Sequence, residues 1–287
     1  MKRPVILLTG AAGQLGFELN RLLPAHGEVE ARDRAALDLA DADAVAATVR
    51  RVKPQIIVNA AGYTAVDRAE SEPALADAIN ARAPAILAEE ANRLGALLIH
   101  YSTDYVFDGT STEPYREEDP PNPLNVYGRS KLAGEGAIAA AGGAHLILRT
   151  SWIYGWHGQN FLLTMKRLAA TRDELRVIAD QFGVPNWSRV LAEATASLIG
   201  RGAAALAKKS GIYHLSGGGR ASWFDFARAI FDDPDHPRVV PITTAEYPTP
   251  ARRPASAVLG ASKLEDTFGI ALPDWRQTLA ACKAAAI

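Results

Sequence analysis

A phenol and a primary amine stand four residues apart in the segment Tyr127-Gly128-Arg129-Ser130-Lys131. On a helix this spacing places Tyr127 and Lys131 on one face. A free tyrosine has a pKa of about 10, and a nearby cation lowers that pKa. The pair predicts a carbonyl reductase: Tyr127 donates a proton to the carbonyl oxygen as hydride reaches the carbon, while Lys131 tunes the phenol and binds a nicotinamide ribose.

The same chemistry needs a hydroxyl that orients the carbonyl, and the run from His100 to Asp104 offers two. This run ends an apolar stretch predicted to be a strand, and ligands of α/β sheets bind beyond the carboxyl ends of strands. We select Thr103 as the third catalytic residue, with Ser102 as the alternative. Both hydroxyls could instead only cap the strand, just as a Tyr-x-x-x-Lys pair is often a solvated helix face.

A glycine-rich turn, Thr9-Gly10-Ala11-Ala12-Gly13-Gln14-Leu15-Gly16, follows the first apolar run. Gly10 permits a tight turn, Gly13 lets the backbone approach a pyrophosphate and Gly16 allows close helix–strand packing, while the helix N-terminus attracts the phosphates. The spacing is G-x-x-G-x-x-G rather than the more familiar G-x-G-x-x-G. An ordinary strand-to-helix turn is the alternative, but the position after the first strand favours a dinucleotide site.

The end of the second predicted strand bears on the choice of cofactor. An acidic residue about 20 residues after the glycine turn holds the adenosine ribose in this kind of site, and Asp33 stands there. Arg32 and Arg34 flank it, and either could neutralise a 2′-phosphate. The cofactor is therefore predicted to be NADPH or NADH, with both accepted. Asp38 could reach the adenine or cap a helix.

Short apolar runs alternate with helical patterns up to Ser151. This order favours an α/β fold of the Rossmann type, with a doubly wound parallel sheet. We predict a dinucleotide-binding domain over residues 1–151. Residues 152–287 are predicted to form a smaller α/β substrate-binding lobe, from which some segments return to pack on the first domain. The stretch 232–254 is rich in proline and is predicted to be loops that close over a substrate.

Composition excludes several classes of partner. The 287 residues carry a formal net charge of −1 and include 48% hydrophobic and 22% charged residues. This balance argues against general binding to nucleic acid or to a membrane surface. No stretch approaches the roughly 20 apolar residues of a membrane span, and no signal peptide is recognised. The single cysteine, Cys282, excludes an internal disulfide and fits cytoplasmic residence.

Longer motifs make the sequence resemble one family over nearly its whole length. They are the glycine turn, Asn59-Ala60-Ala61, the run from Ser102 to Gly109, Tyr127 to Lys131, Arg149-Thr150-Ser151-Trp152, Asp180-Gln181-Phe182-Gly183 and Arg253-Pro254. In combination they are similar to the dTDP-4-dehydrorhamnose reductases, which are extended short-chain dehydrogenases. The resemblance implies NAD(P)H-dependent reduction of the C4 keto group of dTDP-4-dehydro-6-deoxy-L-mannose, which gives dTDP-L-rhamnose.

The resemblance also assigns residues to the site. It implies that Thr103, Tyr127 and Lys131 form the catalytic group. Contacts with the cofactor are implied, besides those of Gly10 and Gly16, for Gly13, Gln14, Leu15, Asp33, Asp38, Leu39, Gly62, Tyr63 and Thr64, with Tyr101 close by. Contacts with the sugar nucleotide are implied for Thr103, Asp104 and Trp152. Arg253 could pair with the pyrophosphate, Asn160 could line the same pocket, and Trp152 could instead be a core residue.

Some positions depart from the family pattern. Asn186-Trp187 stands where threonine and a small residue are more usual. Some members of the family are dimers joined through acidic side chains and Mg²⁺. Glu18 suits such a ligand, but Arg189 stands where a second acid is expected, which argues against Mg²⁺ and against that mode of dimerisation. No metal site is predicted, and the oligomeric state stays open between monomer and homodimer.

Two other functions stay as alternatives. The regulatory β subunit of methionine adenosyltransferase resembles the same family and binds a partner protein, but a regulatory subunit has no need of the intact Thr103, Tyr127 and Lys131. Another nucleotide-sugar reductase or an epimerase would share the fold. Epimerases of this type usually have longer chains and keep their cofactor tightly bound.

Overall fold

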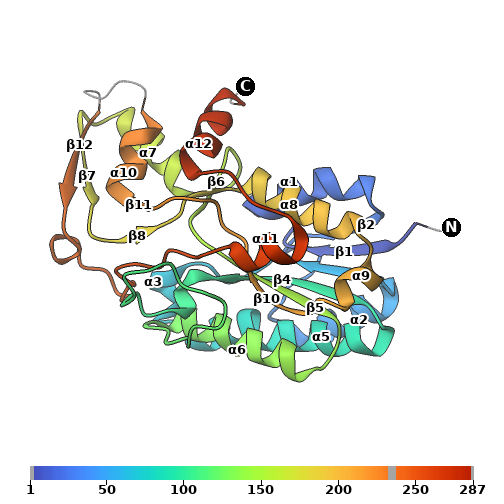
Figure 1. Cartoon of the computed structure of the whole chain (residues 1–287). Coiled ribbons are helices and arrows are strands. Elements are labelled where there is room, and N and C mark those ends of the chain that lie inside the picture. The colour runs from blue at the N-terminus through green and yellow to red at the C-terminus, as the bar shows by residue number, and fades with distance from the viewer. Residues whose placement is uncertain (1–2, 232–236, 286–287) are drawn as a thin grey trace.

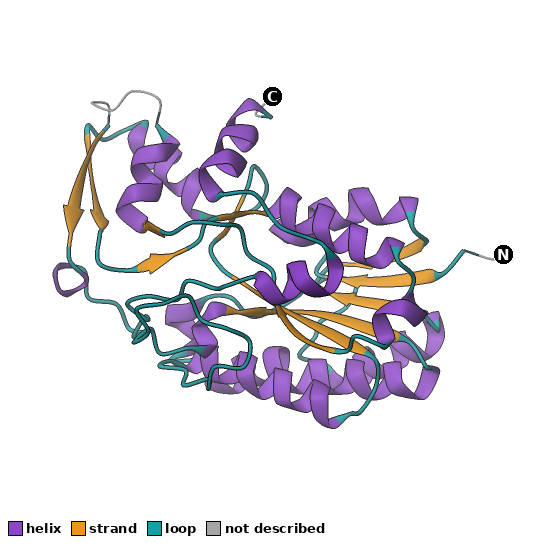
Figure 2. Ribbon diagram, viewed as in Figure 1, coloured by secondary structure: helices purple, strands orange, loops and turns teal. Residues whose placement is uncertain are grey.

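The computed structural model describes residues 3–231 and 237–285, which form two lobes (Figures 1 and 2). The larger lobe contains a six-stranded sheet in the order β10-β5-β4-β3-β1-β2, and every adjacent pair in it is parallel. Its strands are β1 (Val5–Thr9), β2 (Glu28–Arg32), β3 (Ile56–Asn59), β4 (Leu97–Thr103), β5 (His145–Thr150) and β10 (Gly211–His214). The predicted α/β fold with a parallel sheet is confirmed.

Helices cover both faces of this sheet (Figure 1). They are α1 (Gln14–Leu22), α2 (Ala42–Val52), α5 (Ala83–Leu94), α6 (Val126–Ala140) and α8 (Ser188–Gly200). Ile6 and Leu8 of β1 belong to one core cluster, together with Leu191 of α8, whereas Leu7 joins Leu87 of α5 in a second cluster. Because side chains alternate along a strand, a short apolar run fills both cores at once, as a sheet with helices on both faces requires.

The strand order reverses at β1. β2 lies on one side of β1, and β3, β4 and β5 follow on the other side. The connections that leave β1 and β3 therefore run in opposite directions and open a crevice beyond the carboxyl ends of these strands. Ligands of doubly wound sheets bind at this point, so the topology places the functional site there.

The predicted helix between Pro73 and Leu94 is present but irregular. It consists of α4 (Pro73–Asp77), the π-helical turn η2 (Ala78–Arg82) and α5. Pro84 has no N–H to donate to the carbonyl of Asn80, so the ladder of hydrogen bonds changes in the turn before the proline. A Cβ atom at Gly134 would lie 2.1 Å from this carbonyl oxygen. The absence of a side chain at Gly134 therefore lets α6 pack directly against the π-helical turn.

The smaller lobe is built from short elements around an aromatic core that includes Tyr154, Phe226 and Trp275. Its strands pair in twos: β6 with β9 and β7 with β12 are parallel, and β8 with β11 is antiparallel. The elements are β6 (Ile153–Tyr154), α7 (Phe161–Ala169), β7 (Glu174–Ile178), β8 (Phe182–Gly183), β9 (Asn186–Trp187), β11 (Ala221–Ser222), α10 (Trp223–Ile230), β12 (Arg238–Ile242) and α12 (Trp275–Ala284). Short helices elsewhere are η1 (Leu23–Ala25), α3 (Val66–Ala69), η3 (Asp104–Val106), α9 (Ala203–Ala207), η4 (Thr244–Glu246) and α11 (Ser262–Phe268).

The proline-rich stretch differs from its prediction as loops, because β12 lies within it. Pro241 occupies a strand position opposite Val177. Proline is tolerated at this position because β7 is the one strand that pairs with β12 in the described part of the chain, and an edge strand has one side on which no N–H is needed. Pro234 lies outside the described residues. The domain division at residue 151 stays a prediction, while β10 and α8 do return to the large sheet.

Candidate active site

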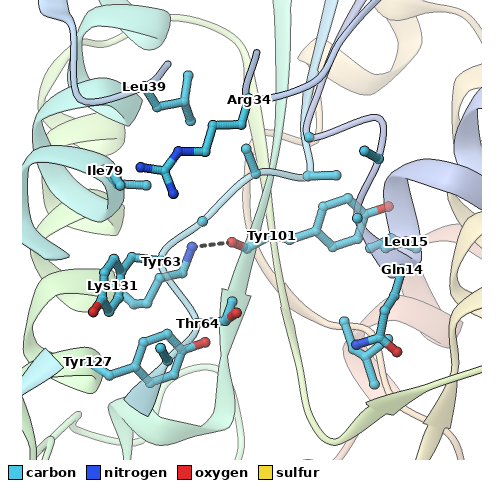
Figure 3. A pocket seen from close by; sticks show the side chains of 18 of the residues that line it. Gln14, Leu15, Arg34, Leu39, Tyr63, Thr64, Ile79, Tyr101, Tyr127 and Lys131 are labelled. Atoms are coloured by element: carbon cyan, nitrogen blue, oxygen red, sulfur yellow. Dashed lines mark hydrogen bonds between the residues drawn. The ribbon is translucent and has the colours of Figure 1, made fainter. Parts of the chain in front are cut away.

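A cavity of about 480 Å³ opens at the carboxyl ends of β1, β3 and β4, where the strand order reverses (Figure 3). The residues that line it include twelve of those predicted to bind the cofactor: Gly10, Gly13, Gln14, Leu15, Asp38, Leu39, Gly62, Tyr63, Thr64, Tyr101, Tyr127 and Lys131. In Figure 3 Gln14 and Leu15 form one side of the cavity, and Tyr63, Tyr127 and Lys131 form the opposite side. The sequence motifs therefore meet in one space.

The glycine turn owes its shape to close backbone contacts. Gly10 has φ +74°, and a Cβ atom there would lie 2.7 Å from the backbone nitrogen of Ala61. A Cβ atom at Gly16 would lie 2.0 Å from the carbonyl oxygen of Gly10. Gly16 does not line the cavity, and its role is the predicted close packing of helix on strand. A side chain at Gly16 would push α1 away from the turn after β1, and a side chain at Gly10 would push that turn away from the loop after β3.

The cavity fits a dinucleotide at this end. Gly13 is the N-cap of α1 and supplies no side-chain cap, so the first N–H groups of the helix are available to a phosphate. The side-chain oxygen of Gln14 is buried and has no hydrogen-bond partner among the described residues. The donors at the helix terminus suit the phosphates of such a ligand, whereas the Gln14 oxygen only accepts and can pair with a ligand hydroxyl or amide but not with a phosphate.

The ribose end of the cavity differs from the expectation in one respect. The Asp33 carboxylate accepts a hydrogen bond of 2.9 Å from the backbone N–H of Ala36, and Asp33 is not among the cavity residues. Arg34 does line the cavity. Arg32 is engaged elsewhere, since it forms an ion pair of 2.6 Å with Glu30. Of the three candidates for this region, the arginine at position 34 is the one placed to meet a ligand.

Asn80 holds the loop after β3 in place, and sequence analysis missed it. Its side-chain oxygen accepts from the N–H of Tyr63 at 2.8 Å, and its amide nitrogen donates to the carbonyl of Tyr63 and to the hydroxyl of Ser130, each at 3.0 Å. Asn80 is fully buried. It thereby links the cofactor loop that carries Gly62 and Tyr63 to the helix that carries Lys131.

Tyr127 and Lys131 lie in the first turns of α6 and face the cavity (Figure 3). Asn125 caps this helix by accepting a hydrogen bond of 2.8 Å from the N–H of Gly128. Burial raises the pKa of Tyr127 to about 12, although a hydrogen bond with Thr103 opposes the rise. Burial also lowers the pKa of Lys131 to about 8. Burial therefore dominates the pKa of Tyr127 in this structure, and the lowering of that pKa by Lys131 stays a prediction.

Thr103 and Ser102 have different surroundings, although both are buried. The Ser102 hydroxyl donates to Glu135 at 2.5 Å, and Glu135 forms a buried ion pair of 2.6 Å with Arg149. The Thr103 hydroxyl instead donates to Oδ1 of Asp104 at 3.0 Å and lies close enough to the Tyr127 phenol to lower its pKa. Of the two candidate hydroxyls, the one selected from the sequence is therefore the neighbour of the phenol.

Asp104 is buried beside this group. Its Oδ1 accepts from the Thr103 hydroxyl at 3.0 Å, and its Oδ2 has no partner among the described residues. Burial raises the pKa of Asp104 to about 7. The carboxyl group is therefore part protonated near neutral pH, and it adjoins the Thr103–Tyr127 contact.

None of the predicted substrate residues is among those that line the cavity, Thr103 and Asp104 included, and Trp152 and Asn160 pack against elements of the small lobe. Trp152 stacks on Trp223. The Asn160 side chain caps α7 by accepting a hydrogen bond of 3.1 Å from the N–H of Leu163. Its amide nitrogen also donates to the carbonyl of Gly155 at 2.9 Å. These contacts give Trp152 and Asn160 structural roles, and their contact with substrate stays a prediction.

Arg253 is half-buried in a bidentate ion pair with Asp67, with N–O distances of 3.0 and 2.8 Å. This pair joins the proline-rich stretch to α3. Asp67 engages both terminal nitrogens of Arg253. The contact of Arg253 with a pyrophosphate therefore also stays a prediction.

The residues that bear on a metal site are dispersed. Arg189 pairs with Glu193 at 3.2 Å on α8, and the described parts of the chain contain no group of three or more His, Cys, Asp or Glu side chains that could hold a metal ion. No helix in the ranges 3–231 and 237–285 combines the length and apolar character needed to cross a membrane.

Because the Tyr127–Lys131 pair faces the cavity that the glycine turn opens, fold and site together define an oxidoreductase of the extended short-chain dehydrogenase/reductase class. The model of the family described as RmlD substrate binding domain matches residues 3–286. The chain belongs to this family, that of the dTDP-4-dehydrorhamnose reductases.

Individual relatives agree over almost the full length. The chain is 48% identical to a dTDP-4-dehydrorhamnose reductase of Burkholderia thailandensis, over 96% of this chain and 97% of that protein. It is 45% identical to the Escherichia coli K12 enzyme of the same name, over 94% of each chain. The crystal structure of the Bacillus anthracis dTDP-4-dehydrorhamnose reductase in complex with NADP matches with a TM-score of 0.92 at 37% identity, over 99% of each chain.

Proposed function

We propose that the chain reduces the C4 keto group of dTDP-4-dehydro-6-deoxy-L-mannose to give dTDP-L-rhamnose, with a reduced nicotinamide dinucleotide as cofactor. The name and the full-length similarity of the relatives support this substrate. The single observation that carries the proposal is the position of Tyr127 and Lys131 in the cavity that begins at the glycine turn. When bound, the reduced nicotinamide supplies the hydride.

The chain's own residues supply the proton. Tyr127 donates it to the developing alkoxide oxygen. Thr103, in contact with the phenol, orients the carbonyl oxygen beside it. Lys131 keeps a cation close to the phenol whenever it is protonated, which favours release of the phenolic proton. Asp104 and Trp152 are proposed to contact the sugar.

NADPH is the preferred cofactor in this proposal. Arg34 lines the cavity, whereas the Asp33 carboxylate is occupied by the N–H of Ala36. A guanidinium recognises a phosphate by charge-assisted hydrogen bonds, and a 2′-phosphate is the group that distinguishes NADPH from NADH. The complex of the Bacillus anthracis relative with NADP supports the same choice.

The decisive experiment follows the oxidation of NADPH and NADH side by side with enzymatically generated dTDP-4-dehydrorhamnose. We expect oxidation with dTDP-L-rhamnose as product, and faster turnover at low concentration with NADPH. Folded protein that binds NADPH but oxidises none of it would refute the proposal and restore the regulatory alternative. Size-exclusion chromatography with light scattering would decide between monomer and homodimer, and cytoplasmic residence stays a prediction.

A further inference from the structure

Two groups at the end of β4 hold Lys131. Its Nζ donates to the backbone carbonyl of Tyr101 at 2.6 Å and lies 3.1 Å from Nε2 of His100. Lys131 is 4% exposed and His100 is fully buried, so the contact is direct and shielded from solvent. The protonation of one ring nitrogen therefore affects which form of the lysine the site favours.

Hydrogen bonds behind the imidazole fix which nitrogen carries the proton. Asn59 Oδ1 accepts from the Thr9 hydroxyl at 2.6 Å and from the backbone N–H of Ala61 at 3.3 Å. These donors turn the amide nitrogen of Asn59 toward His100, where it lies 3.0 Å from Nδ1. An amide nitrogen only donates, so Nδ1 accepts. The neutral ring then carries its proton on Nε2.

The Nε2–H group of His100 faces an amine that is itself a donor when charged. An ammonium has three donors and no acceptor, so it forms no hydrogen bond with Nε2–H. A neutral amine accepts from Nε2–H with its lone pair and still donates to the Tyr101 carbonyl. Burial, together with the charge of Lys131 while the lysine is protonated, holds the pKa of His100 well below its usual value, so the ring stays neutral with either form of the lysine.

We propose that His100 is a positioning residue that acts through Lys131. With its tautomer fixed by Asn59, it stabilises the neutral amine of Lys131 and so sets the pH at which the Tyr127–Lys131 pair loses its exchangeable proton. The consequence for catalysis rests on the proposed reductase function. The tautomer of His100 and the titration of Lys131 can be measured whether or not the protein is a reductase.

Other charged groups near Lys131 act differently from His100. Glu135, one turn further along α6, favours the protonated lysine. Its carboxylate, however, is held by Arg149 of β5 through two bonds of 2.9 and 2.6 Å. Tyr127 lies one turn earlier on the same helix. Further titratable or charged residues from other elements line the cavity: Arg34, Asp38, Tyr63, Arg68 and Tyr101. Among the described residues none of these five side chains has a hydrogen bond to Nζ, since Tyr101 accepts from it only through its backbone carbonyl, so His100 is the side chain that distinguishes the two forms of the amine.

The first test observes the tautomer without cofactor or turnover. In protein with ¹⁵N-labelled histidine, long-range ¹H–¹⁵N spectra report which nitrogen of His100 is protonated, with His100→Gln used for assignment. We expect the proton on Nε2 in the wild type. In Asn59→Asp the new carboxylate accepts from Nδ1–H, so we expect the proton to move to Nδ1. A wild-type ring protonated on Nδ1 overturns the proposal.

The second test titrates Lys131 in protein with ¹³C-labelled lysine, assigned by Lys131→Arg. In His100→Leu, we expect the midpoint to rise by about one pH unit or more, because the opposing donor is gone. In Asn59→Asp, Nε2 becomes an acceptor for the ammonium, and the midpoint should rise too. Asn59→Asp decides the question if His100→Leu does not fold. An unchanged midpoint in the folded variants overturns the proposal.

The third test uses the pH profile of kcat. In both variants the falling limb should move to higher pH, by about the same amount as the midpoint of Lys131. A uniform loss of kcat with an unmoved limb would mean that His100 only packs beside the lysine. Absence of reductase activity in the wild type would defeat the proposed function alone, because the two spectroscopic tests would still decide the role of His100.

Discussion

Trp152 lies flat against Trp223, with ring centroids 3.5 Å apart and planes at 6°. Trp152 has a backbone φ of +40°, which is rare for a bulky residue. The first residue after β5 is Ser151, so this unusual conformation occurs where the chain leaves the large sheet for the small lobe. Stacking on Trp223 of α10 holds the conformation in place. The pair thus couples the orientation of one predicted substrate residue to the packing of the small lobe.

Gly183→Ala tests this coupling. A Cβ atom at Gly183 would lie 2.6 Å from Cε2 of Trp152, and overpacking of this kind costs about 1–3 kcal/mol. We expect the KM for the sugar nucleotide to rise by about tenfold or more, with an unchanged KM for NADPH. Steady-state kinetics with each substrate varied in turn measures both.

Gly136→Ala is the control for Gly183→Ala. A Cβ atom at Gly136 would meet nothing within 4 Å, and alanine in a helix gains about 1 kcal/mol over glycine. This variant should be slightly more stable and kinetically unchanged. Unaltered sugar-nucleotide kinetics in Gly183→Ala would separate Trp152 from the substrate.

Tyr127→Phe removes the proposed proton donor and keeps the ring. In the wild type this ring packs edge-on against Tyr105, with the ring centroids 5.6 Å apart, and the variant should keep that packing. Loss of a general acid typically costs on the order of 100- to 10,000-fold in rate. We expect kcat to fall by that amount while the affinity for NADPH, measured by quenching of tryptophan fluorescence, stays within about twofold of the wild type. Near-normal turnover would remove Tyr127 from the mechanism.

Arg34→Ala should change the choice of cofactor. Loss of a charge-assisted contact with the 2′-phosphate costs about 1.5–3 kcal/mol, which corresponds to a KM for NADPH raised by about tenfold or more. The KM for NADH should barely change. Arg32→Ala is the matched control, since Arg32 pairs with Glu30. Equal effects of both variants on the two cofactors would contradict the role of Arg34.

Asp104→Asn should make the stability of the protein less dependent on pH. Burial raises the pKa of this carboxyl from 3.8 to about 7 in the folded protein, so the folded state binds the proton more tightly than the unfolded state. The free energy of unfolding of the wild type therefore falls by on the order of 4 kcal/mol as the pH rises from about 4 to about 7. It stays at that lower level at higher pH.

Urea unfolding at about pH 8 and about pH 4 measures the effect. The amide variant should be more stable than the wild type at the higher pH and show no such gain at the lower pH. Asp77→Asn, at an exposed position of α4, is the control and should behave like the wild type at both. A gain of equal size at both pH values would show that the carboxyl is not protonated on folding.

Much of the fold could be predicted because short apolar runs and helical periodicities are local signals. The runs around Leu7 and Ile57 are strands, and the glycine turn meets the cavity as expected. The strand β12 was missed because Pro241 argues against a strand wherever its partners are unknown. Its place at an edge, which makes the proline acceptable, depends on β7 and is not visible in the local sequence.

The site was predictable where a motif names its own chemistry and not where tertiary contacts decide. Asn80 gave no signal, because its partners Tyr63 and Ser130 are 17 and 50 residues away. The choice between Asp33 and Arg34 depends on a three-residue turn that takes up the carboxylate. Arg253 meets Asp67 across 186 residues, so no spacing rule could have paired them.

The strand β10 has a consequence for how the chain reaches its structure during synthesis. It covers β5 at one edge of the sheet, yet it starts only at Gly211. Until the ribosome has made those residues, β5 is an open edge strand with Leu146, Ile147 and Leu148 in it, and such edges pair with other chains. A fragment that ends at residue 151 should therefore aggregate rather than fold alone. The nascent chain completes its nucleotide-binding half only after the first elements of the small lobe, β6 to β9, have been translated.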